Sequence, residues 1–419
     1  MLILGLGMIS LYNKIKKYFD FKYILTNRVV KESSVMLTHQ DADCAVTIDN
    51  KKYPHHIGSI IRVLVDNNIS FDVINAPDAS FYGDKHYYNA KSYNSWFLLT
   101  RIISKLLFLI GLNGISDWAK SFYWLGLLKK MKVKIVIGIQ PHPGLCIAAR
   151  KLNIPVFDYQ HGVIDRGHWW YDNKAKTQPI AHLPTDFLCW DSVAHECLSA
   201  WVSKKGISVH IIGNLWIYRF LHPASNDPVI SAFSKSDDLS RINILVTLQP
   251  NLHKYYYKDH DFWVMPESLR MIISERTSDY NWFIRLHPIQ LLDENKYLVE
   301  RYLNESFGAN PNVDWVNCTQ MPLPMLLSTI DMHITDMSTV VLDADYFNIP
   351  SALMSLHLNE GMSLEYLYKE QRIRGGATLV GHDYNNIKEW ICNNSKKNKS
   401  GNNSIEIDLS VILSRFGNE

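Results

Sequence analysis

Two segments of this chain decide its fold: NWFIRLHP at residues 281–288 and ITDMSTVVLD at residues 334–343. Each begins as an apolar strand and ends abruptly in polar residues, and the second runs straight into a helical pattern. Because the carboxyl ends of parallel strands meet at one edge of a sheet, both segments deliver polar side chains to the same edge. α/β domains hold nucleotides at such an edge, so the pair predicts a nucleotide site.

On either side of these segments, short apolar runs alternate with helical stretches. Strands separated by helices predict parallel sheets covered on both faces, and the fold class is therefore α/β, with two Rossmann-like domains facing a central cleft. The predicted strands are 35–38, 71–74, 134–139, 155–159, 186–190 and 209–212, then 242–247, 282–286, 313–316, 332–335, 351–354 and 378–380. The predicted helices lie near 57–67, 94–111, 115–131, 142–152 and 192–205, then near 266–277, 293–303, 322–329, 338–347 and 385–393.

The domain boundaries follow from changes in composition. A stretch rich in proline, serine and aspartate at 221–240 predicts a linker between one domain at residues 1–220 and a second at 241–395. Residues 396–419 begin with many asparagines, lysines and serines, which predict a mobile loop, and they end in an apolar segment.

Composition and charge exclude several classes of protein. With 47% hydrophobic residues among 419, the chain can bury two ordinary cores. The 43 lysines and arginines nearly cancel the 41 aspartates and glutamates, so we expect no nucleic-acid partner. The six cysteines are scattered, without the short spacing of a zinc site or a redox dithiol, which is typical of a reducing cytoplasm.

Common catalytic and metal motifs are missing or misplaced. No Walker loop, Gly-X-Gly-X-X-Gly or Gly-X-Ser-X-Gly occurs, which argues against common ATPases, dehydrogenases and α/β-hydrolases. The acidic pair at 343–345 lies in a predicted helix, where carboxylates two residues apart point about 200° apart and cannot chelate one ion. The pair at 41–43 lies in a loop and could line an acceptor site. We expect no metal and no bound cofactor.

The first segment places three candidate residues at the strand end, namely Arg285, His287 and Pro288. The proline stops the ladder of strand hydrogen bonds and fixes the turn, which leaves the imidazole at the carboxyl edge. There it can donate to a phosphate or ribose oxygen. The alternative is a histidine that hydrogen-bonds only its own loop.

The second segment contributes Asp336, Ser338 and Thr339 at the start of a predicted helix. Their side chains and the backbone NH groups of the first turn favour an anion, because the helix dipole is positive there. The alternative is plain capping of the helix, which uses the same groups.

A third segment, QHGVIDRGH at residues 160–168, follows the strand predicted at 155–159. Gly162 allows a sharp turn that projects His161 past the sheet edge, and an imidazole near neutral pKa is the natural base for an acceptor hydroxyl. A structural loop histidine is the alternative. We assign catalytic roles to His161 and Asp165, and substrate contacts to Gln160, Arg166 and His168.

With these residues in place, the chain resembles glycosyltransferases of the GT-B fold. It is most similar to clans in which an HP motif and a Ser-Ser or Ser-Thr motif bind a cytidine nucleotide: bacterial sialyl- and polysialyltransferases, Kdo transferases and CDP-glycerol glycerophosphotransferases. Residues 285–288 match the HP motif, and residues 334–340 look like the hydroxyl motif. The His-Gly at 161–162 is similar to that of the glycerophosphotransferases, whose histidine is thought to act as a base.

The resemblance implies a metal-independent glycosyltransferase. It would move a sugar from a nucleotide-activated donor, with a CMP-sugar favoured, to a growing surface glycan such as O-antigen or capsule. Residues 241–395 would bind the donor, and residues 1–220 would bind the glycan or lipid-linked glycan acceptor. The alternatives are a CDP-glycerol-type glycerophosphotransferase, a non-catalytic GT-B binding protein, and a UDP-sugar epimerase, for which the acidic residues needed are not evident.

A lipid-linked acceptor implies a cytoplasmic enzyme at the inner face of the cytoplasmic membrane. The apolar start of the chain has no basic residue before it and is too short to span a bilayer, so we expect neither a signal peptide nor an anchor there. Region 95–131 interleaves aromatic residues with lysines, which predicts peripheral contact with an anionic membrane. Ordinary core helices are the alternative. The aromatic residues are Trp96, Phe97, Phe108, Trp118, Phe122 and Trp124.

Overall fold

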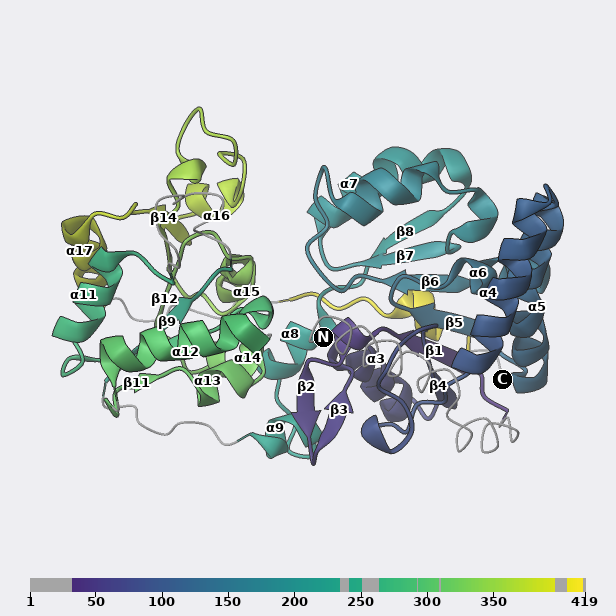
Figure 1. The fold of residues 1–419 in the computed structure, drawn as a ribbon, viewed down its shortest axis with the longest axis horizontal. Coiled ribbons are helices and arrows are strands. Elements are labelled where there is room, and N and C mark those ends of the chain that lie inside the picture. Colours follow the sequence, from purple (N-terminus) through teal and green to yellow (C-terminus); the bar gives the residue numbers. More distant parts are fainter. Residues whose placement is uncertain are drawn as a thin grey trace, which may run out of the picture. The chain divides into compact units, whose positions relative to one another are not determined.

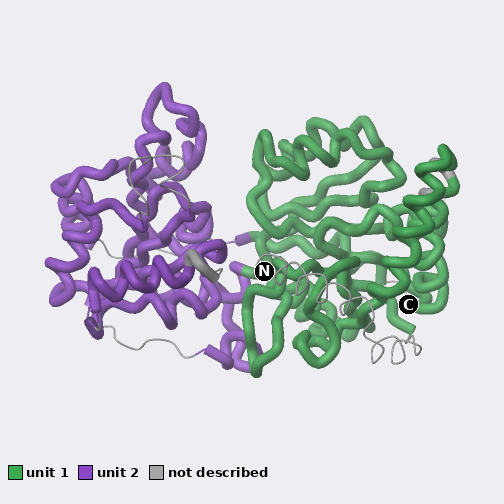
Figure 2. The backbone as a smooth tube through the Cα atoms, viewed as in Figure 1, with its two compact units in different colours: residues 1–216, 406–419 green, residues 217–405 purple. Residues whose placement is uncertain are grey.

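The computed structural model describes residues 32–233, 241–250, 264–291, 293–308, 310–395 and 405–416. The chain forms two compact units: residues 1–216 together with 406–419, and residues 217–405 (Figure 2). Each unit is built on a six-stranded sheet in which all neighbouring strands run parallel (Figure 1). The predicted α/β class with two Rossmann-like domains is therefore confirmed.

The sheet of unit 1 has the strand order β4-β1-β5-β6-β7-β8. Its strands are β1 (Val35–His39), β4 (Phe71–Asn75), β5 (Ile135–Gly138), β6 (Val156–Tyr159), β7 (Asp186–Cys189) and β8 (Ser208–Ile211). Its helices are α3 (His55–Asp66), α4 (Asn94–Leu109), α5 (Asn113–Met131), α6 (Pro143–Lys151), α7 (Ser192–Val202) and, near the carboxyl terminus, α18 (Ser410–Leu413). Helix α8 (Leu215–Leu221) crosses the boundary into unit 2.

Alternate residues of β1 pack into different cores. Val35 and Leu37 join the helix α3 cluster, whereas Met36 joins the cluster that contains Trp124 of α5. Successive side chains of a strand point to opposite faces, so both faces of this sheet are buried. This burial explains why the central strands β1 and β5 contain continuous apolar runs instead of an alternating pattern.

The sheet of unit 2 has the order β11-β10-β9-β12-β13-β14. Its strands are β9 (Ile242–Thr247), β10 (Tyr280–Arg285), β11 (Val313–Asp314), β12 (Met332–Thr335), β13 (Ser351–Leu353) and β14 (Ala377–Leu379). Its helices are α9 (Pro228–Ala232), α11 (Glu267–Glu275), α12 (Asp293–Phe307), α13 (Asn317–Gln320), α14 (Leu323–Leu327), α15 (Val340–Tyr346), α16 (Lys369–Ile373) and α17 (Tyr384–Asn394). The fully buried indole of Trp282 belongs to its main core.

Every strand of both sheets begins and ends within two residues of its predicted position. The sequence reading missed a small antiparallel hairpin, β2 (Val46–Ile48) and β3 (Lys51–Tyr53). Its turn residues Asp49 and Asn50 have φ of 50° and 61°, the left-handed conformation that a two-residue hairpin turn requires. The sequence signal for this hairpin was the aspartate-asparagine pair between the two short strands.

Within the stretch predicted as a linker, 221–240, the structure contains helix α9. The proline and aspartate that suggested turns start this helix: Asp227 accepts hydrogen bonds from the NH groups of Val229 and Ile230, and Pro228 occupies the first helical position. The Asp227 carboxylate also forms a two-bond ion pair with Arg219, and both side chains are almost completely buried. Residues 234–240 lie outside the described part of the chain.

The final apolar segment returns to unit 1. Ile412 of α18 is buried in the cluster that contains α3, and Ile407 and Leu409 pack against the same cluster. Residues 396–404, predicted as a mobile loop, lie outside the described ranges.

The Arg219–Asp227 pair yields a stability prediction. Replacing Asp227 with alanine leaves a buried guanidinium without its carboxylate and removes the cap of α9, so we expect the free energy of unfolding to fall by about 3–5 kcal/mol. Urea denaturation followed by tryptophan fluorescence measures this change. The matched control is Asp279→Ala, which breaks the exposed pair with Arg276. Equal denaturation midpoints for the two variants would contradict a structural role for the buried pair.

Candidate functional site

The two segments that decide the fold end at the same edge of the unit 2 sheet. Strands β10 and β12 lie on either side of β9, with Arg285 and Thr335 both in register with Thr247. Since neighbouring strands are about 4.8 Å apart, the two strand ends are separated by roughly 10 Å. The predicted convergence of the segments on one carboxyl edge is therefore what the structure shows.

His287 lies beyond the end of β10 with its ring held by its own loop. Ring atom Nδ1 lies 3.1 Å from the backbone NH of Ile289, and the backbone NH of His287 donates to the carboxamide of Gln290 at 2.8 Å. Burial lowers the pKa of the imidazole, which favours the neutral form. Because Nδ1 accepts a hydrogen bond, the proton of the neutral ring is on Nε2, which can donate to a ligand oxygen.

The side chain of Arg285, predicted to contact the nucleotide, forms hydrogen bonds within the protein. Its guanidinium donates to the backbone carbonyls of Cys318 and of Met321, the latter at 2.7 Å, and burial lowers its pKa. These bonds tie the 318–321 segment to β10, so the geometry favours a supporting role for Arg285. Pro288 is exposed and begins the short 3-10 turn Pro288–Leu291.

The two hydroxyls of the second segment have separate roles. Ser338 is buried, and its hydroxyl oxygen accepts a hydrogen bond from the NH of Val340 at 3.3 Å, which matches the capping alternative. Thr339, at the start of α15, is exposed and makes no side-chain capping bond. Thr339 is therefore the hydroxyl that is accessible to a ligand.

Asp336 is buried directly after β12, and burial raises its pKa to about 6. One carboxylate oxygen lies 3.4 Å from Nε2 of His382, which follows β14. The sequence reading missed His382, although it follows a predicted strand just as His287 does.

A second missed residue, Gln249, follows the central strand β9. Its carboxamide oxygen is buried and has no hydrogen-bond partner among the residues that the structure describes. Losing water without gaining a partner is unfavourable. Other buried atoms of the described residues share this property, among them Ser33 Oγ and Trp124 Nε1, so the position of the Gln249 oxygen is what distinguishes it. Gln249 lies between the end of β10 and the end of β12, so this oxygen marks the middle of the edge as a place where a ligand can bind.

In unit 1, the predicted residues follow β6. Gln160 is buried and uses both ends of its carboxamide within the protein, donating to the carbonyl of Gly162 and accepting from the NH of Trp190, each at 2.8 Å. It therefore shapes the loop after β6. The next residue, His161, is half-buried, with Nδ1 3.3 Å from the hydroxyl of the buried Tyr171.

Burial lowers the pKa of His161 to about 4, although the nearby carboxylate of Asp43 acts in the opposite direction. The imidazole is therefore neutral at pH 7. A neutral ring has an unprotonated nitrogen that can accept a proton, but a pKa of about 4 lies well below the near-neutral value that was expected of a general base from the sequence.

The remaining predicted residues lie on the loop that follows His161. Asp165 is half-buried, and burial raises its pKa. Arg166 is exposed. His168 caps the helical turn Trp169–Lys174, with Nδ1 3.2 Å from the NH groups of both Trp170 and Tyr171. The geometry thus gives His168 a local structural contact.

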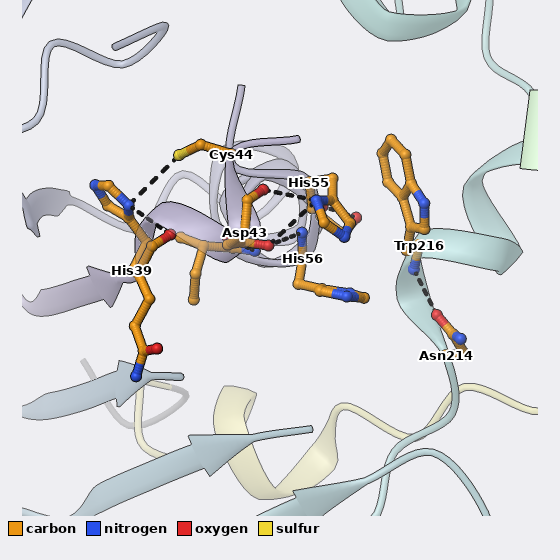
Figure 3. Close-up of polar contacts among 10 residues, drawn as sticks. His39, Asp43, Cys44, His55, His56, Asn214 and Trp216 are labelled. Atoms are coloured by element: carbon orange, nitrogen blue, oxygen red, sulfur yellow. Dashed lines mark hydrogen bonds and ion pairs between the residues drawn. The ribbon is translucent and has the colours of Figure 1, made fainter. Parts of the chain in front are cut away.

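Unit 1 also gathers a group that the sequence reading did not connect with His161 (Figure 3). The carboxylate of Asp43 accepts hydrogen bonds from the NH groups of His56 at 2.8 Å and Ile57 at 3.2 Å, in the first turn of α3. Nδ1 of His55 lies 2.6 Å from the carbonyl oxygen of Asp43. The charge of Asp43 raises the pKa of His161 and that of His55 lowers it, so both residues act on the ring electrostatically.

Two groups of metal-ligand residue types occur in the described part of unit 1, namely His39, Cys44 and His86, and Asp43, His55 and His56. Nδ1 of His86 lies near the NH groups of Tyr88 and Ala90, at 3.2 and 3.4 Å, and accepts from them. The proton of neutral His86 is therefore on Nε2, which then cannot bind a metal. In the second group, each carboxylate oxygen of Asp43 accepts one backbone hydrogen bond from the first turn of α3. The absence of a metal stays a prediction.

A cavity of about 410 Å³ opens at the carboxyl ends of β1, β4 and β5. The chain passes from β1 to β4 on one side and then to β5 on the other, which is the kind of switch point where α/β sheets bind ligands. The lining contains carboxylates, carboxamides and an indole, and neither lysine nor arginine. Its polar and aromatic members are Gln40, Asp41, Asp78, Gln140, His142 and Trp170.

Comparisons with known proteins agree on the fold. No protein-family model matches the chain, and no curated protein sequence matches it. The UDP-GlcNAc 2-epimerase of Methanocaldococcus jannaschii is similar in structure, with a TM-score of 0.52, 15% identity, and coverage of 89% of this chain and 95% of that chain. A putative UDP-N-acetylglucosamine 2-epimerase of Listeria monocytogenes also has a TM-score of 0.52, with 12% identity and coverage of 87% and 88%. At these identities the likeness establishes a GT-B-like fold.

The burial of His161 yields a prediction about its titration. We expect histidine NMR between pH 4 and 8 to show the ring of His161 neutral throughout the range above pH 5, with the resonance assigned by its loss in His161→Gln. The same pKa shift makes the stability of the folded protein depend on pH. The unfolded chain binds a proton near pH 6.5 and the folded chain only near pH 4, so this residue lowers stability as the pH falls between those values. A midpoint at or above pH 6.5 would contradict the buried environment.

Proposed function

We propose that this protein is an enzyme of nucleotide-activated sugars, with the nucleotide bound at the carboxyl edge of the unit 2 sheet. The observation that supports this most directly is the convergence of the β10 and β12 ends on either side of Gln249, whose buried side-chain oxygen has no partner among the described residues. On one side, Nε2 of His287 can donate to a phosphate or ribose oxygen. On the other side, the exposed hydroxyl of Thr339 offers a second donor.

The reaction that we favour is glycosyl transfer. The bond between the sugar carbon and the nucleotide phosphate breaks, a bond from that carbon to an acceptor oxygen forms, and the acceptor proton passes to neutral His161. Hydrogen-bond donors at the unit 2 edge stabilise the charge that grows on the leaving phosphate. The resemblance of residues 285–288 and 334–340 to the cytidine-nucleotide clans supports a CMP-sugar donor and a surface-glycan acceptor.

The unit 1 cavity suits the acceptor of such a reaction. Carboxylates and carboxamides accept and donate hydrogen bonds to hydroxyl groups, and an indole packs against the apolar face of a sugar ring. Without a lysine or arginine in its lining, the cavity favours a neutral sugar over a phosphorylated one.

A second candidate is epimerisation of a UDP-sugar. The fold shared with two proteins named as UDP-N-acetylglucosamine 2-epimerases favours it. Asp41 and Asp78 both line the unit 1 cavity. The NH groups of Ser80 and Phe81 donate to the Asp41 carboxylate, and Arg101 forms an ion pair with Asp78. Incubation with UDP-N-acetylglucosamine alone, followed by proton NMR, distinguishes the candidates: a C2 epimer formed without any acceptor supports the epimerase.

The nucleotide site is tested by thermal shift with CMP, CDP, UDP and GDP. A ligand at one hundred times its Kd stabilises the folded state by about 2.7 kcal/mol, so a bound nucleotide raises Tm clearly. We expect CMP to give the largest shift and His287→Ala or Thr339→Ala to reduce it. Lys296→Ala, an exposed change on α12, serves as the matched control. If none of the four nucleotides changes Tm, the proposed site is wrong.

The proposed base is tested in a transfer assay that uses the nucleotide selected above and a panel of neutral sugar acceptors. We expect His161→Ala to lower kcat by roughly 100-fold or more while the nucleotide-induced shift in Tm stays unchanged, because the residue lies in the other unit. His195→Ala, on helix α7, is the control. Transfer at the wild-type rate by folded His161→Ala protein would remove this residue from the mechanism.

A further inference from the structure

Helices α4 and α5 pack against each other, and α5 packs on α6, so α4 is the outer layer of this side of unit 1 (Figure 1). The distribution of side chains on α4 is inverted relative to a water-soluble helix, whose apolar stripe faces the core. Its buried residues are Asn94, Phe97 and Ser104, two of which are polar. Its exposed residues are mostly large and apolar.

The exposed apolar side chains are concentrated along this hairpin, with exposed fractions between 41% and 70%. Scattered single apolar residues are normal on a protein surface, but a concentration of them on one helical hairpin is typical of an interaction site. The residues are Trp96, Leu99, Ile102, Ile103, Leu106, Phe108 and Leu109 of α4, Ile110 and Leu112 of the connection, and Ile115, Trp118 and Phe122 of α5.

The charges of the hairpin are almost all positive. Residues 94–131 contain five lysines and arginines and one acidic residue. Lys105 on α4 and Lys129 and Lys130 at the end of α5 are exposed, and Arg101 forms an ion pair with Asp78. An apolar face bordered by lysines, with tryptophans among its side chains, is complementary to the surface of a bilayer that contains anionic lipids.

We propose that this hairpin, residues 94–131, docks on an anionic membrane surface. The apolar side chains enter the boundary between head groups and acyl chains, and the lysines lie beside lipid phosphates. Within the described ranges, no helix is long and apolar enough to cross a bilayer. Two copies of the chain that paired through this face would bring like charges together, which opposes self-association.

Vesicle flotation tests the proposal without nucleotide or acceptor, so the result is independent of the enzymatic function. We expect the full chain to float with phosphatidylcholine vesicles that contain phosphatidylglycerol, and to float much less with phosphatidylcholine alone. The double variant Phe108→Glu with Leu109→Glu removes two exposed apolar groups and adds two negative charges, so we expect its binding to fall by more than about tenfold. These side chains are 63% and 70% exposed, so the fold should tolerate the change.

The matched control is Ile373→Glu, which changes an equally exposed apolar residue of unit 2. It should float like the wild type, and Tm measurements should show that all variants are folded. Equal flotation of the wild type and the double variant would overturn the proposal. So would a wild type that stays unbound and elutes as a dimer that the double variant dissociates, because a second copy would then cover the face.

Discussion

The site depends on one constraint: a parallel sheet that is buried on both faces leaves only the ends of its strands for polar groups. In unit 1, Val35 and Met36 enter different cores, so neither face of β1 is available to a ligand. The chain must therefore place hydrogen-bonding side chains where strands end. Both units do this at their carboxyl edges, which explains why the residues with chemistry follow strands and not helices.

The sequence predicted the fold well because its signal is local. Many strands of the two sheets, such as β1, β5 and β9, contain an apolar run ended by polar or turn residues, and such runs indicate the strand boundaries closely. The roles of single side chains were harder to predict because they depend on distant partners. Arg285 and Gln160 have the chemistry of ligand-binding residues, yet both form hydrogen bonds within the protein. Arg285 donates to the carbonyls of Cys318 and Met321, and Gln160 accepts from the NH of Trp190. Those partners are not adjacent in the sequence.

Residues that the pattern missed also depend on contacts over long sequence distances. His382 lies close to Asp336, and the Asp43 carboxylate accepts hydrogen bonds from the first turn of α3 and acts on the pKa of His161. The spacing of these residues in the sequence predicts neither contact. Gln249 could have been found, since it follows a predicted strand between two others. The same rule that selected His287 selects it once the strand order is known.

The return of the carboxyl-terminal segment to unit 1 makes unit 2 an insertion in the sequence of unit 1. During synthesis, residues 217–405 leave the ribosome before Ile412 is available to complete the first core. Domains tend to fold as units, so unit 2 can reach its native state while unit 1 still exposes part of its apolar interior. Unit 2 can therefore complete its core before unit 1, because Ile412 follows the whole of unit 2 in the chain.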